Sequence, residues 1–294
     1  MSDALVPPEG PIGAQPESPV CARHADRPTR LRCTRCDRPA CPDCLREAAV
    51  GYQCVDCVNE NRKTSRRSQT LVGAEQTDGR PVVTQVLMVL NALAFVVTAV
   101  QAGSPFVNQT SQIFVASSLQ PLLTANGEWW RILTSGFMHF GLWHLVLNMA
   151  VLYIAGSSVE PELGRLRFTV VYFLSLLGGN AAAFYFGGVG GQLAGASGAV
   201  FGIMGALIVV WKRQKRDIST VVVIVVINLV SNFFTDASLL AHLGGFVIGG
   251  LLTLAMVKAP RENRNLYQIG AVVAAVVLIA GMFALRAQDL MYSW

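Results

Sequence analysis

The chain has 294 residues, of which 52% are hydrophobic and only 14% are charged. Because a soluble domain carries about a quarter charged residues, this composition excludes an ordinary soluble protein and indicates long apolar segments separated by polar loops. The formal net charge of +5 calls for no nucleic-acid partner, since most of the excess Lys and Arg lies in short loops beside apolar segments, where it fixes orientation in a membrane.

The first 81 residues are polar and divide into three predicted parts. Residues 1–20 are rich in proline and are expected to be a disordered lead. Residues 21–57 contain every cysteine of the chain and are predicted to bind metal. Residues 58–81 are polar, include the run RKTSRRS, and are predicted to be a basic linker.

The cysteine-dense stretch has four pairs of potential ligands, each pair with two residues between its members. The pairs are Cys21 and His24, Cys33 and Cys36, Cys41 and Cys44, and Cys54 and Cys57. Eight such ligands suit two structural, tetrahedral zinc ions. The spacing between pairs resembles a B-box-type cross-braced finger, which implies that the first and third pairs bind one ion and the second and fourth the other. The alternative is a disulfide cluster, which requires an oxidising compartment.

Seven apolar segments follow and are candidate membrane spans, because a span needs about 20 mostly apolar residues. They lie near 82–102, 141–159, 166–187, 197–211, 218–234, 238–257 and 267–285. The stretch 103–140 is long and half apolar, and its Trp129 and Trp130 suit the membrane interface. The sequence therefore predicts an all-α polytopic membrane protein preceded by a small metal-binding module.

Charge counting predicts the orientation. With a cytoplasmic N-terminus, the inside loops are 160–165, 212–217 and 258–266, and they carry most of the Lys and Arg of the apolar region. The positive-inside rule therefore favours a cytoplasmic N-terminus and an outside C-terminus. The expected location is the plasma membrane of a bacterium. A cytoplasmic N-terminus also argues against a disulfide cluster there, because the cytosol keeps thiols reduced.

Four polar residues then fall at similar depth in the outer half of the membrane. Ser197, in GASGAVFGIMG, begins the fourth segment, and His242 lies about one turn into the sixth. His144 and Asn148 occupy the first two turns of the second segment and share one helix face. An imidazole near the hydroxyl would activate a serine nucleophile, while the other two side chains and the Ser197 amide would suit an oxyanion.

Glycines support a close approach of the fourth and sixth segments. Gly198, Gly202 and Gly205 recur at helical spacing on one, and Gly245 and Gly249 follow His242 on the other. Small residues at such positions let helix backbones touch. Taken singly, an intramembrane serine is more often a packing residue, and a lone His or Asn often links helices. Their coincidence at one depth favours a functional site.

Residues 82–257 resemble the rhomboid family of intramembrane serine proteases. GASGAVFG matches its GxSG motif and implies that Ser197 is the nucleophile, with Gly195 and Gly198 as supports. AHLGGFVIGG implies that His242 is the base, with Gly245 and Gly249 beside it. HFGLWHLVLNM, beginning at His139, implies that His144 and Asn148 form the oxyanion hole. EWWRILTSGFMH supplies Trp130 and Arg131, and Phe201 is placed to stack on the imidazole.

The resemblance also implies a six-helix catalytic core over 82–257, with 258–294 as an extra transmembrane helix and C-terminus. Catalysis would use a Ser-His dyad without an acid and without a cofactor; Asp236 and Glu160 lie near the span ends, but neither suits His242 as a partner. The expected activity is hydrolysis of transmembrane or juxtamembrane peptide bonds in membrane-protein substrates. The metal-binding module would bind a cytosolic protein.

Two other functional classes fit parts of this pattern. A transporter or channel with broken helices and a polar midplane site would explain the glycine-rich span entrances. A non-catalytic membrane scaffold would use the cysteine module for recruitment. Neither explains why a nucleophile, a base and oxyanion donors occur together at one rim.

Overall fold

The structure is a computed structural model that describes residues 18–64, 70–74, 79–231 and 239–292. Contacts divide the chain into two compact units, residues 1–67 and 68–294. The described residues 18–64 are called here the N-terminal module, and the second unit is called the helical unit. Most of the predicted lead 1–20, as well as Asp236, lies outside the described residues.

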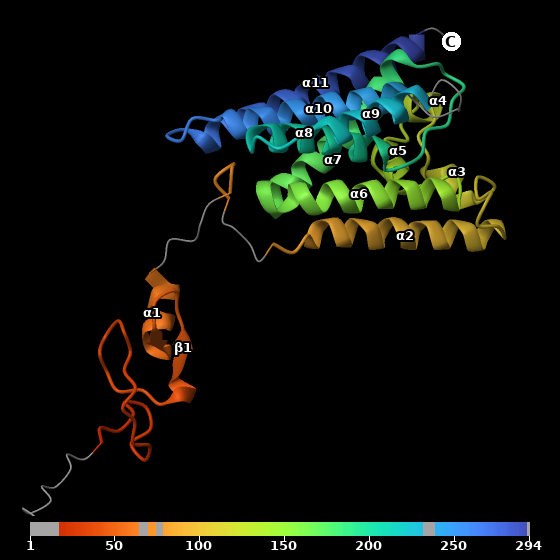
Figure 1. Ribbon diagram of the computed structural model, residues 1–294. Helices are drawn as coiled ribbons and strands as arrows, with labels where there is room; N and C mark the ends of the chain where they lie inside the picture. Colours follow the sequence, from red (N-terminus) through yellow and green to blue (C-terminus); the bar gives the residue numbers. More distant parts are fainter. Residues whose placement is uncertain (1–17, 65–69, 75–78, 232–238, 293–294) are drawn as a thin grey trace, which may run out of the picture. The chain divides into compact units, whose positions relative to one another are not determined.

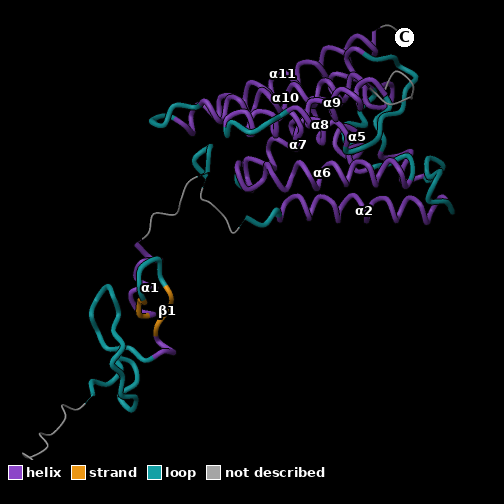
Figure 2. Tube along the Cα trace, viewed as in Figure 1, coloured by secondary structure: helices purple, strands orange, loops and turns teal. Residues whose placement is uncertain are grey.

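The N-terminal module has little regular structure. A 3-10 turn, η1 (Pro42–Cys44), leads into a hairpin of β1 (Leu45–Glu47) and β2 (Tyr52–Cys54), which is followed by α1 (Val55–Thr64) (Figure 2). Leu45 pairs with Cys54 in the antiparallel hairpin. Residues 58–64, the first part of the predicted basic linker, therefore continue α1. They contain neither glycine nor proline, so nothing in their sequence ends the helix.

The helical unit contains one helix for each apolar segment of the sequence. They are α2 (Val82–Ala102), α6 (Leu142–Leu163), α7 (Arg165–Phe186), α8 (Ser197–Arg213), α9 (Ser219–Ser231), α10 (Leu239–Lys258) and α11 (Arg264–Tyr292) (Figure 1). Of these, α2, α6, α7, α10 and α11 are long and apolar enough to cross a membrane. The protein is thus a mostly helical, polytopic membrane protein. The number of seven spans stays a prediction, because α8 has 17 residues and α9 has 13.

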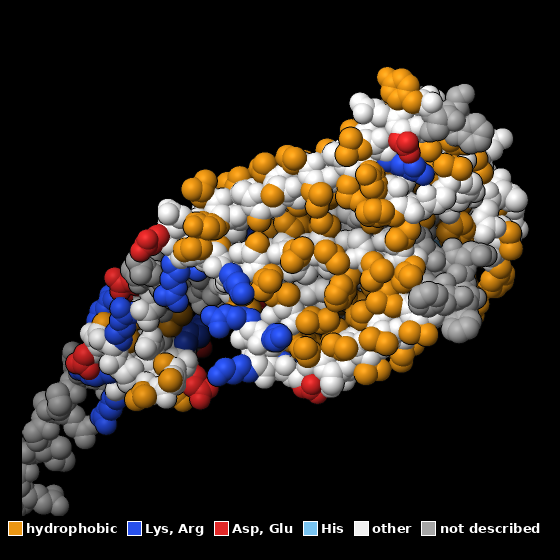
Figure 3. Space-filling model, turned by 90° about the horizontal axis from the view of Figure 1, so that it is seen from above, with side chains coloured by type: hydrophobic (Ala, Val, Ile, Leu, Met, Phe, Trp, Pro, Cys, Tyr) orange, Lys and Arg blue, Asp and Glu red, His pale blue; other side chains and the backbone are white. Residues whose placement is uncertain are grey.

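The outer surface of the helical unit is apolar. Leu93, Leu147, Ile227 and Val277 are among many exposed aliphatic side chains on its helices. In Figure 3, hydrophobic side chains are spread over the whole visible face of this unit, with few charged side chains between them. Such a surface would be unstable in water and is the one expected of helices in contact with lipid.

Glycines bring α8 and α10 into backbone contact at the centre of the bundle. A Cβ added at Gly245 would lie 2.0 Å from the carbonyl oxygen of Gly198, and one at Gly249 would lie 2.3 Å from that of Gly202. No side chain larger than hydrogen fits at either place. α8 is enclosed by α6, α7 and α10, which agrees with its many buried residues. The start of α8 is therefore held against the start of α10.

Residues 103–140 fold on the surface of the bundle as short helices. These are α3 (Gln112–Ser117), α4 (Pro121–Ala125), α5 (Arg131–Thr134) and the 3-10 turn η2 (Ser135–Phe137). Arg131 is only 4% exposed and donates to the carbonyl oxygens of Val115 and Ser118. The Trp130 ring N–H donates to the carbonyl of Ala116. These two side chains hold α5 against α3.

Glu160 fixes the start of α2. Its buried carboxylate accepts hydrogen bonds of 2.8 Å from the backbone N–H groups of Val83 and Thr84 and from the Thr84 hydroxyl. These amides belong to the first turn of α2, where backbone donors have no partner within the helix. A negatively charged carboxylate there also interacts favourably with the positive end of the helix dipole.

A turn in the segment predicted to be a linker belongs to the helical unit. Val72 is 0% exposed and is part of the hydrophobic core of this unit. Its carbonyl accepts a hydrogen bond from Gln268 Nε2 on α11, which also donates to the carbonyl of Met256 on α10. The segment predicted as a basic linker over 58–81 therefore contains the end of α1 and a turn that packs on the helical unit.

Candidate active site and candidate metal centres

The side chains of Ser197 and His242 meet between α8 and α10. The distance from Ser197 Oγ to His242 Nε2 is 2.8 Å, which is that of a hydrogen bond. His242 is 8% exposed, and the ring of Phe201 stacks on its imidazole, with 4.3 Å between ring centroids and 7° between planes. Phe201 follows Ser197 by about one turn of α8, so a single helix carries both the hydroxyl and the ring that holds the imidazole.

The backbone before Ser197 makes a turn that requires glycine. Gly195 has φ of +132°, a conformation that other residues rarely adopt. A Cβ on Gly195 would lie 2.8 Å from Cε1 of His144, so that space is already filled. Ala196 is the N-cap and Ser197 the first residue of α8. The Ser197 N–H is consequently one of the amides without a partner within the helix, at the positive end of its dipole.

Ser197 and His242 open onto a cavity of about 640 Å³. His144 lines it beside them, and Gln109 and Gln192 add amide groups. Asn180 also lines it, but its Nδ2 donates to Ile132 and Ser135. Among the described residues that line the cavity there is no carboxylate. The arrangement combines a hydroxyl, an imidazole and several hydrogen-bond donors in one space that is large enough for an extended peptide segment.

His144 is positioned by neighbouring rings from the preceding loop. Phe140 stacks on it at 5.8 Å between centroids, and the Phe140 N–H lies 3.4 Å from His144 Nδ1. His139 is fully buried, with its ring centroid 5.2 Å from that of His144. His139 thus contacts the cavity-lining histidine but does not itself line the cavity.

Asn148 is near this group but is oriented differently. Its Nδ2 donates to the carbonyl of His144, one turn earlier on α6, at 2.8 Å. It is mostly buried and is absent from the residues that line the cavity. Its second amide hydrogen remains for a group that enters beside His144. The structure thus brings Ser197, His242 and His144 together, with Asn148 behind His144.

Several residues that support the site were not singled out from the sequence. Asn180 on α7 donates to the carbonyl of Ile132 and to Ser135 Oγ, and the carbonyl of Ser135 accepts the Gly195 N–H. The backbones of Leu119 and Leu193 also pair as a short antiparallel bridge. An asparagine in an apolar helix was the available signal for Asn180; the two loop contacts had none.

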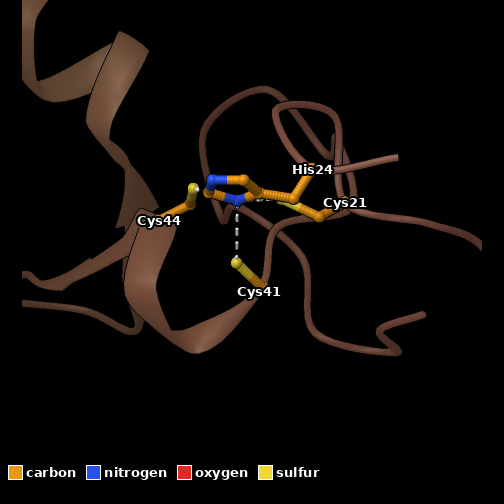
Figure 4. A group of neighbouring side chains, drawn as sticks. All are labelled: Cys21, His24, Cys41 and Cys44. Atoms are coloured by element: carbon orange, nitrogen blue, oxygen red, sulfur yellow. Dashed lines mark hydrogen bonds between the residues drawn. The ribbon is translucent and has the colours of Figure 1, made fainter. Parts of the chain in front are cut away.

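The cysteine and histidine pairs of the N-terminal module assemble into two groups of four. One contains Cys21, His24, Cys41 and Cys44, and the other contains Cys33, Cys36, Cys54 and Cys57. Within each group all potential ligand atoms lie within 4.8 Å of one another. The first group thus combines the first and third pairs of the sequence, and the second group combines the second and fourth. This is the combination that a cross-braced finger requires. Figure 4 shows the first group converging on the His24 ring.

The distances within these groups fit a tetrahedral metal ion. Zinc with ordinary bond lengths separates two sulfurs by about 3.8 Å and a sulfur from a nitrogen by about 3.5 Å. His24 Nδ1 lies 3.8, 3.4 and 3.3 Å from the sulfurs of Cys21, Cys41 and Cys44, respectively. Cys36 and Cys54 have 3.7 Å between their sulfurs, far from the roughly 2.05 Å of a disulfide. All seven cysteines are free.

Two thiols in these groups need a cation to ionise at neutral pH. Burial raises the pKa of Cys44 to about 11, and a hydrogen bond with Cys36 raises the pKa of Cys57 to about 12. In contrast, the backbone N–H of Cys41 lowers the pKa of Cys21 to about 6. At neutral pH the module therefore contains a thiol that ionises by itself and thiols that would release their protons only when a metal binds.

Comparison with known proteins gives the class to which these helices and this serine–histidine pair belong. Residues 126–259 match the Rhomboid domain family. Rhomboid protease GluP of Bacillus subtilis is 32% identical over 69% of this chain and 40% of its own length. The putative rhomboid protease YdcA of Bacillus subtilis is 31% identical over 48% of this chain and 73% of its own length. Rhomboid protease AarA of Providencia stuartii is 26% identical over 68% of this chain and 81% of its own length.

The chain belongs to the rhomboid family. The matched region contains α6 through α10, and with them Ser197, His242, His144 and Asn148. The chain spans less than half the length of several of the relatives it matches, 40% of GluP and 49% of RHOMBOID-like protein 5 of Arabidopsis thaliana. The N-terminal module lies outside the residues matched to the Rhomboid domain.

Proposed function

We propose that this rhomboid is an intramembrane serine endopeptidase that cleaves peptide bonds of membrane-protein substrates within or beside the membrane. The observation that carries the proposal is the 2.8 Å contact between Ser197 Oγ and His242 Nε2 in a cavity lined by further donors. An activated serine needs an adjacent base within hydrogen-bonding reach. Membership of the rhomboid family, which includes named proteases, supports the same activity.

The proposed reaction follows from these positions. His242 takes the proton of Ser197 while the hydroxyl oxygen attacks the substrate carbonyl. The oxyanion that forms would be stabilised by the Ser197 N–H at the helix terminus, by His144 and by the second N–H of Asn148. His242 then protonates the leaving amine, and water hydrolyses the acyl-enzyme. Phe201 stacks on the imidazole and limits its movement, which is one part of the role that a carboxylate has in a Ser-His-Asp triad.

The substrate must present an unfolded stretch of backbone. The amides and carbonyls of a helix are hydrogen-bonded to each other, and in hydrocarbon they have no water as an alternative partner. A transmembrane helix can therefore be cut only where it unwinds into the cavity. Small or helix-weakening residues near the scissile bond lower the cost of unwinding.

Covalent labelling tests the catalytic serine directly. The purified full chain in detergent should react with a fluorophosphonate probe at Ser197 and should cleave a model type I transmembrane protein. A transporter or a non-catalytic scaffold would do neither. Failure of both reactions in protein that remains folded would contradict the proposal.

We further propose that residues 21–57 are a B-box-like, cross-braced module with two structural zinc ions. Cys21, His24, Cys41 and Cys44 would hold one ion, and the remaining four cysteines the other. Zinc would supply the bonds that close the module, and no zinc would take part in peptide hydrolysis. Because the module lies outside the catalytic helices, its proposed role is to bind a cytosolic protein.

The proposed domain boundaries place the six-helix core at 82–257 and the extra helix at 258–294. The proposed orientation has the N-terminus in the cytoplasm and the C-terminus outside, in a bacterial plasma membrane, on the strength of the basic inside loops. A tag placed after Trp294 should be accessible from outside intact cells. Accessibility from the cytoplasm alone would overturn both the orientation and the count of seven spans.

A further inference from the structure

Asn180 is a polar side chain in the middle of the apolar helix α7, and it is 6% exposed. Both of its amide hydrogens are used. Nδ2 donates to the carbonyl of Ile132 at 2.7 Å and to Ser135 Oγ at 3.0 Å. The amide cannot be turned over, since its oxygen would then face the carbonyl oxygen of Ile132. A polar side chain in such surroundings costs free energy, and where one occurs it usually has a function.

The first consequence of these bonds is that the end of α5 is fixed to α7. The carbonyl of Ile132 belongs to the last turn of a short helix, where carbonyls lack a partner within the helix. Gly136, which follows Ser135, lies directly against α7. A Cβ added at Gly136 would be 2.4 Å from a methyl group of Leu176 on that helix. Asn180 and Gly136 therefore set how closely the turn at Ser135 approaches α7.

The second consequence concerns the backbone that leads to the nucleophile. The carbonyl of Ser135 accepts the Gly195 N–H at 2.9 Å. Gly195 is two residues before Ser197, and its unusual φ sets the direction in which α8 begins. Because this N–H is taken by Ser135, Gly195 does not donate to an oxyanion; its bond instead fixes the peptides that follow, including the Ser197 N–H.

We propose that Asn180 is a positioning residue for the oxyanion hole, an inference that rests on the proposed protease function. It acts through Ser135 and Gly195 on the direction of the Ser197 N–H. An oxyanion donor is effective only when it lies about 2.7–3.1 Å from the oxygen that becomes charged. A displacement of about 1 Å can cost 10²-fold in rate. The backbone bridge between Leu119 and Leu193 holds the segment that leads to Ser197 at a point two residues before Gly195. We therefore expect this segment to stay folded when Asn180 is replaced.

The test compares Asn180→Ala with Asn91→Ala in the full chain. Asn91 is a fully buried asparagine whose Nδ2 donates to the carbonyl of Leu87 in its own helix, α2, and it does not line the cavity. It is a matched control for the loss of a buried amide. For each variant, kcat and KM are measured on a transmembrane substrate in detergent, together with the fluorophosphonate labelling rate and Tm.

Asn180→Ala should lower kcat and the labelling rate together by about 10- to 100-fold with little change in KM, because the transition state and the phosphonate adduct both use the oxyanion hole. Asn91→Ala should lower Tm and, at temperatures below that Tm, leave kcat unchanged. Ser135→Ala, which removes only the hydroxyl and keeps the carbonyl, should give a smaller loss in the same direction.

A variant Asn180→Ala with unchanged kcat and a lowered Tm would make Asn180 a purely structural residue and overturn the inference. If Asn180→Ala does not fold, the isosteric Asn180→Asp decides in its place, since it keeps the volume and replaces the donor by oxygen. Wild-type protein that neither cleaves nor reacts with the probe would instead overturn the proposed function, so the two failures are distinguishable.

Discussion

The N-terminal module and the helical unit both bring distant residues together, but different contacts hold them there. The buried hydrophobic side chains of the module are mostly cysteines, accompanied among the described residues by Ala40 and Leu45. The helical unit has a large apolar core, and its α8 and α10 touch through glycine backbones. A module of this size buries too little apolar surface to fold by itself and needs a further source of stability. Stability should therefore depend on metal in one region and on close helix packing in the other.

The same difference separates the chemistry of the two regions. In the module, the cysteine and histidine side chains converge on points where a cation would bind, so their role would be structural, to hold that cation. In the helical unit, Ser197 and His242 contact each other and face a cavity, so they remain available for a reacting molecule. The following experiments test this division.

Replacing Ser197 or His242 by Ala should abolish cleavage, with a loss of about 10⁴-fold or more, and the double variant should be no worse than either single one. The two groups act as a unit, because a hydroxyl without its base is not deprotonated. Cleavage of a transmembrane substrate by purified variants measures this.

Ser158→Ala is the matched control for Ser197→Ala. The Ser158 hydroxyl bonds to the carbonyl of Ile154 in its own helix and does not line the cavity, so cleavage should be retained. Substantial cleavage by Ser197→Ala, in a preparation free of other proteases, would refute the dyad.

The second experiment removes metal from the module. The full chain should contain two zinc ions, and Cys33→Ser combined with Cys41→Ser should lose both, because one ligand is taken from each group. Structural zinc sites contribute about 10–16 kcal/mol of binding free energy at pH 7, so residues 18–64 should unfold and become sensitive to protease while α2 through α11 stay intact. Metal analysis that finds one ion or none in the wild type would reject the two-site arrangement.

Zinc retention should also depend on pH. The pKa values of Cys44 and Cys57 are raised to about 11 and about 12, so both thiols are protonated at neutral pH unless metal displaces the proton. Each displaced proton makes binding weaker as pH falls. Zinc loss on acidification, measured with a chromogenic chelator, should therefore be steep; retention independent of pH would argue against thiolate ligands.

The third experiment concerns the oxyanion hole. Asn148→Ala should lower kcat by about 10²–10³-fold, the usual effect of removing one donor, and leave KM nearly unchanged. Asn228→Ala is the control, because Asn228 makes the same bond to its own helix, to the carbonyl of Ile224 at 2.8 Å, outside the cavity. Equal activity of the two variants would show that Asn148 only stabilises α6.

The meeting of Ser197 with His242 could be predicted from the sequence, whereas the contacts that orient Ser197 could not. Helical spacing, the charged loops and the glycines place both residues at one depth on facing helices, and the structure has them 2.8 Å apart. The bond from Ser135 to Gly195 depends on the path of two irregular segments, which no periodicity encodes. The geometry of these loops is therefore the part of the site that the sequence pattern does not predict.

The N-terminal region shows the same limit. The resemblance of the ligand spacing to a cross-braced finger predicted which pairs would assemble, and the structure has them in two groups of four. The docking of Val72 was missed, since a short turn with one buried valine looks like any other polar linker in sequence. A buried residue is recognised from sequence only where a helix or strand repeats it.

Paired glycines provide a smaller test of helix packing. Gly249→Ala should destabilise the helical unit by about 1–3 kcal/mol, the usual effect of overpacking, because its Cβ would lie 2.3 Å from the carbonyl oxygen of Gly202. At neighbouring Gly250 the nearest atoms are 3.9 Å away, and alanine there should be neutral or slightly stabilising, since glycine weakens a helix. Thermal unfolding in detergent measures both variants. An equal Tm would show that α8 and α10 can separate without cost.

The smallest expected effect is that of removing the N-terminal module. Deletion of residues 1–64 should leave kcat, KM and the stability of the helical unit as in the full chain, because the described residues it removes contribute nothing to the cavity. Deletion of residues 1–74 removes Val72 as well. That change should cost about 1.5–3 kcal/mol of stability, the value of a buried valine, and Gln268 loses one of its two carbonyl partners. If cleavage is lost already in the shorter deletion, while Tm is retained, the module takes part in catalysis, and the separation of the two regions is incorrect.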